Sequence, residues 1–131
     1  MAEEVIDVVL VEDNDIFRET LELLLDVTPD TRVAASVADG EAALAACRET
    51  RADVVLLDYR LPGMDGVETT AGIRRACPEA AVVVLTASVE PEEIEALRGA
   101  GAVACLTKDR ELDEIVGAIR DAARRCGAAD R

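Results

Sequence analysis

Acidic side chains follow two apolar runs of the chain, at positions where carboxylates can bind a cation. Glu12 and Asp13 come directly after the run 8–11, and Asp58 comes directly after the run 54–57. Runs of valine and leucine are typical of strands buried on both faces of a parallel sheet, where ligands bind beyond the carboxyl ends of the strands. If the two strands are neighbours, three negative charges meet in one crevice. Such charges repel one another, so the pattern predicts either a bound divalent ion or a carboxyl group with a raised pKa.

Two further strand ends add polar groups of other kinds. The run 81–85 ends in Thr86, and the run 103–106 leads to Thr107 and Lys108. A hydroxyl group and an ammonium group are therefore expected beside the three acids. Each of these residues alone is more often an ordinary turn, cap or surface residue. Their joint placement at the ends of successive strands is what indicates a site.

The composition limits the kinds of protein that this chain can be. Its 131 residues suit one domain, and 14 basic against 28 acidic residues leave a net charge of −14. That charge argues against direct binding to nucleic acid or to an anionic membrane, so proteins and cations are the expected partners. No apolar stretch approaches the roughly 20 residues that span a bilayer, and no secretory signal is present, which favours a cytoplasmic protein. Four widely spaced cysteines without any histidine predict free thiols, neither a zinc site nor a disulfide framework.

Five strand patterns alternate with five helix patterns along the chain. This alternation predicts an α/β fold, a doubly wound, five-stranded parallel sheet flanked by five helices. The expected strands are 8–11, 33–37, 54–57, 81–85 and 103–106. The expected helices are 16–27, 41–50, one through 76 that Asp65 caps, 91–98, and one that begins at about 112. One domain over 1–126 is expected, followed by a flexible tail over 127–131.

Together these residues resemble the receiver domain of two-component response regulators over nearly the whole chain. The residues that carry the resemblance are Glu12-Asp13, Thr86-Ala87, Lys108 and the tract Asp58-Tyr59-Arg60-Leu61-Pro62-Gly63-Met64-Asp65-Gly66. The resemblance implies a flavodoxin-like receiver fold. Within the family, the tract Leu106-Thr107-Lys108-Asp109 resembles the NarL/FixJ subfamily, because it lacks the proline that commonly follows the lysine in a cis peptide bond.

The resemblance implies a chemical reaction at the third strand end. Asp58 is the expected phosphoacceptor, a carboxylate nucleophile that takes a phosphoryl group from a sensor histidine kinase. Mg²⁺ is the expected cofactor, because phosphoryl transfer to a weak nucleophile depends on positioning and charge neutralisation. The ligands implied for the ion are the carboxylates of Asp13 and Asp58 and the backbone carbonyl of Arg60, with Glu12 binding the ion through a water molecule.

The resemblance also implies how the phosphate is held and sensed. Lys108 and the Thr86 hydroxyl are expected to bind phosphoryl oxygens, and the small Ala87 leaves room for the phosphate. The family's switch positions are Thr86 and the residue three positions before the lysine, where the family has an aromatic ring and this chain has Cys105. A cysteine moves little surface when its rotamer changes. The response is therefore expected mainly in the loop after Thr86 and in the helix 91–98.

The favoured function is a phosphorylation-controlled binding switch. The catalysis expected of it is slow transfer of a phosphoryl group to itself and slow dephosphorylation of itself. A constitutive, phosphorylation-independent interaction module is expected to have lost Asp58 or Lys108, and both are present. An aspartyl-nucleophile phosphohydrolase usually has a second acid two residues after the nucleophile, where this chain has Arg60. Both alternatives stay open on the sequence alone.

The resemblance extends to possible partners. A homodimer through the fourth helix, the fifth strand and the fifth helix is expected. The chain is either a stand-alone receiver or the receiver of a longer regulator, whose output in this subfamily is typically a C-terminal helix-turn-helix DNA-binding domain.

Overall fold

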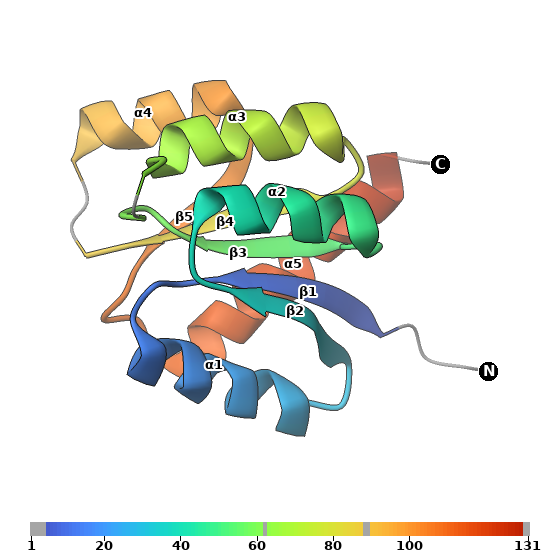
Figure 1. The fold of residues 1–131 in the computed structure, drawn as a ribbon. Coiled ribbons are helices and arrows are strands. Elements are labelled where there is room, and N and C mark those ends of the chain that lie inside the picture. The colour runs from blue at the N-terminus through green and yellow to red at the C-terminus, as the bar shows by residue number, and fades with distance from the viewer. Residues whose placement is uncertain (1–4, 62, 88–89, 130–131) are drawn as a thin grey trace.

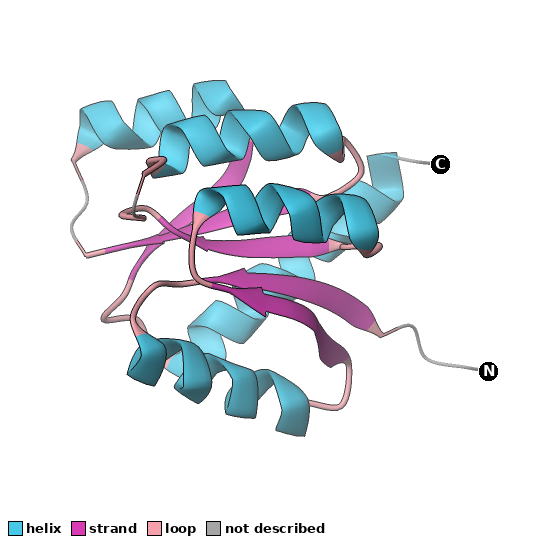
Figure 2. Cartoon of the chain, in the orientation of Figure 1, coloured by secondary structure: helices cyan, strands magenta, loops and turns pink. Residues whose placement is uncertain are grey.

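The apolar runs of the sequence form one parallel sheet, which the computed structural model describes within residues 5–61, 63–87 and 90–129. The strands are β1 (Ile6–Val11), β2 (Thr31–Val37), β3 (Val54–Asp58), β4 (Ala81–Thr86) and β5 (Ala102–Thr107). They are parallel to their neighbours and lie in the order β2-β1-β3-β4-β5. The helices are α1 (Asp15–Val27), α2 (Gly40–Glu49), α3 (Gly66–Ala76), α4 (Pro91–Ala100) and α5 (Leu112–Ala129). The expected α/β fold is confirmed, and Figure 2 shows the two helical layers around the sheet.

Alternating side chains along the strands divide the core into two layers. α2, α3 and α4 cover one face of the sheet, and α1 and α5 cover the other (Figure 1). Val9 and Val11 of β1 belong to the first layer, whereas Val8 and Leu10 belong to the second. The three central strands are therefore buried on both faces, which explains why their sequences are uninterrupted apolar runs.

β2 and α4 extend beyond the ranges that the sequence pattern predicts, for local reasons. β2 begins at Thr31, whose hydroxyl donates a hydrogen bond to the carbonyl of Leu25 at 2.6 Å. This bond holds Thr31 in the sheet. Because Thr31 is polar, a search for alternating apolar residues does not assign it to the strand. α4 continues through Gly99 and ends only at Gly101, which has a φ of 115°. This left-handed conformation favours glycine and ends the helix.

The last helix also extends beyond its expected end. α5 includes residues 127–129, a segment for which the sequence predicts a flexible tail. Residues 130–131 lie outside the described part of the chain. Within the described ranges, no helix combines the length and the apolar character that crossing a bilayer requires.

Two cysteines are buried where α2 and α3 pack together. Cys47 and Cys77 belong to the core layer beneath these helices, and the Cys77 thiol donates a hydrogen bond to the Cys47 carbonyl at 2.9 Å. Cys47, Cys77 and Cys105 are free thiols, as the sequence predicts.

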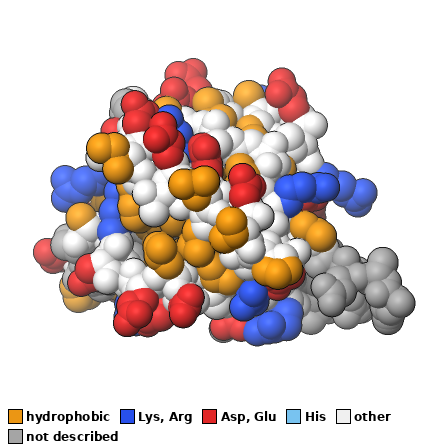
Figure 3. All heavy atoms as spheres, turned by 90° about the horizontal axis from the view of Figure 1, so that it is seen from below, with side chains coloured by type: hydrophobic (Ala, Val, Ile, Leu, Met, Phe, Trp, Pro, Cys, Tyr) orange, Lys and Arg blue, Asp and Glu red, His pale blue; other side chains and the backbone are white. Residues whose placement is uncertain are grey.

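α1 leaves an apolar stripe exposed on the outer surface. Ile16, Leu23 and Val27 are largely exposed, and their spacing places them along one side of the helix. Figure 3 shows hydrophobic side chains gathered on the side of the molecule that α1 and α5 form, with acidic side chains around them. The opposite side of the helix, through Leu21 and Leu25, is fully buried against the sheet.

Candidate functional site

The order of the strands reverses between β1 and β3, at the point where the acidic residues lie. The chain leaves β1 toward β2 on one side and later returns to β3 on the other side. The loops that follow β1 and β3 therefore diverge and leave a crevice between them. The register pairs Val11 with Leu57, so the residues that follow each of them lie at the same edge of the sheet.

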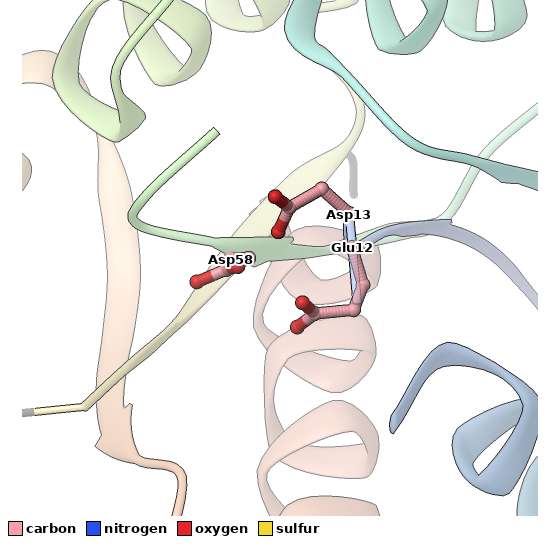
Figure 4. Close-up of side chains that lie close together, drawn as sticks. All are labelled: Glu12, Asp13 and Asp58. Carbon is pink, nitrogen blue, oxygen red and sulfur yellow. The ribbon is translucent and has the colours of Figure 1, made fainter. Parts of the chain in front are cut away.

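Three carboxylates meet at this edge, as the pattern of strand ends predicts. Figure 4 shows Glu12 and Asp13, from the end of β1, and Asp58, from the end of β3, close together. One oxygen of each lies within 4.8 Å of the other two. Glu12 is 1% exposed and Asp58 is 4% exposed, whereas Asp13 is open to solvent. This arrangement suits a divalent cation that takes oxygen ligands on one side and water on the other.

Lys108 brings a positive charge to the same crevice. Its Nζ lies 3.1 Å from Glu12 Oε1 and 3.2 Å from Asp58 Oδ2. The backbone N–H of Lys108 donates a hydrogen bond to the Thr86 carbonyl at 2.8 Å. The ends of β4 and β5 are thus tied together, and the lysine side chain is positioned over the two buried acids.

Burial and neighbouring charges shift the pKa values of this cluster. Burial is the largest cause of the raised pKa of Glu12, and the nearby charge of Asp58 raises it further. The backbone N–H of Asn14, which donates to Glu12 Oε2 at 3.0 Å, acts in the opposite direction. Burial would lower the pKa of Lys108, but its contacts with Glu12 and Asp58 outweigh burial and raise it. The acids therefore hold the ammonium in its charged form.

The state of Glu12 is consistent with a metal at this site. Glu12 Oε1 is buried and receives no aligned hydrogen bond, although the Lys108 ammonium is 3.1 Å away. Buried polar atoms without a hydrogen-bond partner are uncommon, and each calls for an explanation such as an ion. Together with the carboxylates of Asp13 and Asp58, this oxygen fits the hard-cation chemistry of Mg²⁺.

The other predicted site residues lie at or behind this edge. Thr86 is buried at the end of β4, and Ala87 follows it at the surface. The backbone N–H of Arg60 donates a hydrogen bond to Asp58 Oδ1 at 3.2 Å, so this residue touches the proposed nucleophile. Cys105 is half-buried and packs against the core layer that α2, α3 and α4 cover, and burial raises the pKa of its thiol.

Two residues at the start of α1 reach the site although the sequence did not assign them to it. Asn14 is the N-cap of α1, and its side chain accepts a hydrogen bond from the backbone N–H of Phe17 at 2.9 Å. The Phe17 ring lies beside Lys108, with its centroid 5.2 Å from Nζ. Helical periodicity assigns Phe17 only to the core face of its helix. One feature of the sequence could have indicated that Phe17 lies at the site: it is the single phenylalanine of the chain, and it follows Glu12-Asp13 closely.

Mg²⁺ is expected to raise the melting temperature of the protein. The ion relieves repulsion among the three acids, and binding to the folded state alone stabilises it by about 1.4 kcal/mol at ten times Kd. Asp13→Ala should weaken Mg²⁺ binding and reduce the stabilisation, as measured by thermal unfolding across a Mg²⁺ titration. Asp15→Ala, which removes a nearby exposed acid paired with Arg18, is the control and should respond like the unmodified protein. A melting temperature that does not change at millimolar Mg²⁺ would count against the metal site.

Known protein sequences resemble this chain over most of its length. The family model of the response regulator receiver domain matches residues 8–120. The chain is 33% identical to the transcriptional regulatory protein LiaR of Bacillus subtilis (strain 168), in an alignment that covers 91% of this chain and 56% of LiaR. It is also 33% identical to the nitrate/nitrite response regulator protein NarP of Escherichia coli (strain K12), over 89% of this chain and 54% of NarP. The chain spans about half the length of the curated relatives it matches.

Solved structures give the same result. The signal receiver domain of a regulator designated NarL from Mycobacterium tuberculosis superposes with a TM-score of 0.88 at 36% identity, covering 92% of this chain and 98% of that one. A two-component response regulator of the LuxR family from Aurantimonas sp. SI85-9A1 superposes with a TM-score of 0.87 at 31% identity, covering 92% and 86%. The expected flavodoxin-like receiver fold and the likeness to NarL-type regulators are confirmed. This chain belongs to the family of response regulator receiver domains of two-component signal transduction.

Proposed function

We propose that Asp58 accepts a phosphoryl group from a sensor histidine kinase in a Mg²⁺-dependent reaction, and that the modification switches a protein contact. The observation that carries this proposal is the crevice itself. Three carboxylates lie within 4.8 Å of one another, and the Lys108 ammonium lies 3.2 Å from Asp58 Oδ2. Membership of the receiver family supports a histidine kinase as the phosphoryl donor.

The residues of the crevice have separate tasks in this reaction. A carboxylate oxygen of Asp58 forms a bond to phosphorus while the nitrogen–phosphorus bond of the donor breaks, and its electron pair returns to the imidazole nitrogen. Before the reaction, the Arg60 N–H and the Lys108 ammonium hold the two oxygens of this carboxylate in place. Afterwards Lys108 pairs with one phosphoryl oxygen and the Thr86 hydroxyl with another, beside the small Ala87. When bound by the carboxylates, and by the Arg60 carbonyl, Mg²⁺ supplies charge neutralisation at the phosphoryl oxygens.

The proposal is tested by phosphoryl uptake from acetyl phosphate, without any kinase. We expect one phosphoryl group per chain, detected by intact mass, that is stable in acid and labile in base as an acyl phosphate is. Uptake should require Mg²⁺ and stop when EDTA is added. A protein that takes up no phosphoryl group under these conditions would contradict the proposal.

The two alternative functions account less well for the site. A constitutive interaction module does not need Asp58 and Lys108 in contact at a crevice of acids. A phosphohydrolase would need a general acid and base beside the nucleophile, and Arg60 occupies the position where such enzymes have one. A structural response to beryllofluoride with Mg²⁺ separates the switch from the constitutive module.

We propose the output of the switch from the relatives. LiaR is by name a transcriptional regulatory protein, and NarP a response regulator. In a longer regulator, a receiver formed by residues 1–126 would control a C-terminal helix-turn-helix DNA-binding domain, while this acidic domain itself would not bind DNA. A homodimer through α4, β5 and α5 is the proposed contact within such a regulator. A histidine kinase as donor implies a cytoplasmic protein.

The response to phosphorylation is expected mainly in α4 and in the loop before it. α4 has one buried residue, Leu97, and its N-cap Glu90 makes no side-chain capping bond. The N-caps of α1, α2 and α3 all make such a bond. A helix with few anchoring contacts rearranges at low cost. Residues 88–89 of the preceding loop lie outside the described part of the chain.

Amide hydrogen exchange with and without beryllofluoride measures this response. We expect the largest changes in peptides that cover α4, and a Cys105→Ser variant that still responds, because a small thiol moves little surface. The expectation fails if the changes are confined to α1 while α4 is silent. Loss of the whole response in Cys105→Ser would show instead that the thiol is an essential switch residue.

A further inference from the structure

We propose that Phe17 is a positioning residue for Lys108, whose ring keeps the ammonium in the crevice while the carboxylates are engaged elsewhere. The inference rests on the proposed function of Asp58. The ring centroid is 5.2 Å from Nζ. Attraction between a cation and the electron-rich face of an aromatic ring is effective within about 6 Å of the centroid.

A circuit of hydrogen bonds fixes the backbone of Phe17, from which the ring projects, relative to the site. The Phe17 N–H donates to the side chain of Asn14 at 2.9 Å, and the Asn14 N–H donates to Glu12 Oε2 at 3.0 Å. The same oxygen of Glu12 accepts a hydrogen bond from Lys108 Nζ at 3.4 Å. Phe17 is also half-buried and packs against the core layer of α1 and α5. The residues that build the site therefore also position this ring.

Among the neighbours of the ammonium just named, the ring is the one that a metal ion does not bind. Glu12 and Asp58 both contact Lys108, and both offer oxygens to a divalent cation. When these oxygens are engaged, the lysine loses its partners, and its side chain is already 28% exposed to water. The ring is neutral and offers no oxygen ligand, so it stays available. The ring therefore stabilises the ammonium more after the carboxylates bind the cation than before. Only such a difference between the two states can shift the equilibrium toward the cation-bound state.

The sequence makes this contact testable at a single ring. The chain contains one phenylalanine and one lysine. Biosynthetic replacement of phenylalanine by analogues with one, two or three ring fluorines therefore changes Phe17 alone. Fluorines withdraw electrons from the ring face and weaken its attraction for a cation, while they make the ring more apolar. A role in packing alone predicts unchanged or improved function, whereas the positioning role predicts a stepwise loss.

The measurement is the affinity for beryllofluoride at a fixed Mg²⁺ concentration. We expect the affinity to fall with each added fluorine, by about threefold overall and by at most about thirtyfold, as the usual strength of this contact implies. Phe17→Leu should lose a similar factor, and Phe17→Tyr should retain the affinity because it keeps the ring face. Ile16→Ala, which removes the exposed neighbouring side chain, is the control and should have no effect.

A second measurement reports on the lysine directly. The metal-free protein is labelled with ¹⁵N-lysine, and the resonance of the Lys108 side-chain nitrogen Nζ is observed. Phe17→Leu should shift this resonance, because the ring current of Phe17 is removed. The proposal is overturned if fluorination leaves the affinity unchanged or raises it, or if the lysine resonance does not respond to Phe17→Leu. A native protein that binds no beryllofluoride at all would contradict the proposed function of Asp58 instead. The lysine resonance would still decide whether Phe17 holds Lys108.

Discussion

The Asp58→Asn variant is expected to take up no phosphoryl group from acetyl phosphate, under conditions in which the unmodified protein takes up one. An amide has nearly the shape of the carboxylate but is not a nucleophile toward phosphorus. The substitution also removes one of the two buried acidic groups that face Lys108, so the fold should survive, with a change in unfolding free energy within about 1 kcal/mol. Intact mass measures the uptake, and chemical denaturation measures the stability.

The control for this experiment is an acid far from the crevice. Asp26→Asn replaces an exposed carboxylate of α1 and should leave the uptake unchanged. Uptake that persists in Asp58→Asn would show that another residue is the acceptor. Uptake lost in both variants would point to a general effect of charge on the reaction.

Lys108→Ala is expected to keep phosphoryl uptake but to lose most of the structural response to it. The ammonium contacts Asp58, and in the proposed mechanism it does not attack phosphorus but pairs with the phosphoryl group once that group is present. Removing it also leaves Glu12 and Asp58 buried without their cation, which should cost about 1–3 kcal/mol of unfolding free energy. Amide exchange with beryllofluoride measures the response, and urea denaturation measures the cost.

The stability of Lys108→Ala should depend on pH in a definite direction. The pKa of Glu12 is raised in the folded protein, so folding favours its protonated form. Ionised Glu12 therefore lowers the free energy of unfolding. This loss is absent below the ordinary carboxyl pKa and grows as the pH rises through the raised value. The loss of unfolding free energy in Lys108→Ala, relative to the unmodified protein, should therefore shrink as the solution is acidified from neutral pH. Arg110→Ala, which removes an exposed cation of the same loop, should show neither the deficit nor this pH dependence.

Residues buried on both faces made the sheet predictable from the sequence. The runs that form β1, β3 and β4 contain almost nothing but valine, leucine and alanine, and turn-forming residues separate them from the helices. In a parallel sheet the carboxyl ends of the strands share one edge, so the meeting of Glu12, Asp13 and Asp58 followed from their positions alone. The same rule brought Lys108 to the site.

Other features depend on tertiary contacts that no local pattern contains. Thr31 joins β2 through a hydrogen bond to Leu25, a residue of α1, and apolar alternation has no means of detecting it. The contact of Phe17 with Lys108 requires the orientation of α1 and the rotamers of both side chains. Periodicity gives the face of a helix on which a residue lies, but not which distant charge its ring will meet.

The two buried thiols between α2 and α3 allow the protein to report its own unfolding. Burial raises the pKa of Cys47 to about 12, and it raises that of Cys77 as well. Iodoacetamide reacts with the thiolate form, so the folded protein keeps both sulfurs nearly inert. Alkylation at these positions therefore counts molecules in which this layer has opened. When closing is faster than alkylation, the rate relative to that of the unfolded chain gives the free energy of opening, by mass spectrometry and without an added probe.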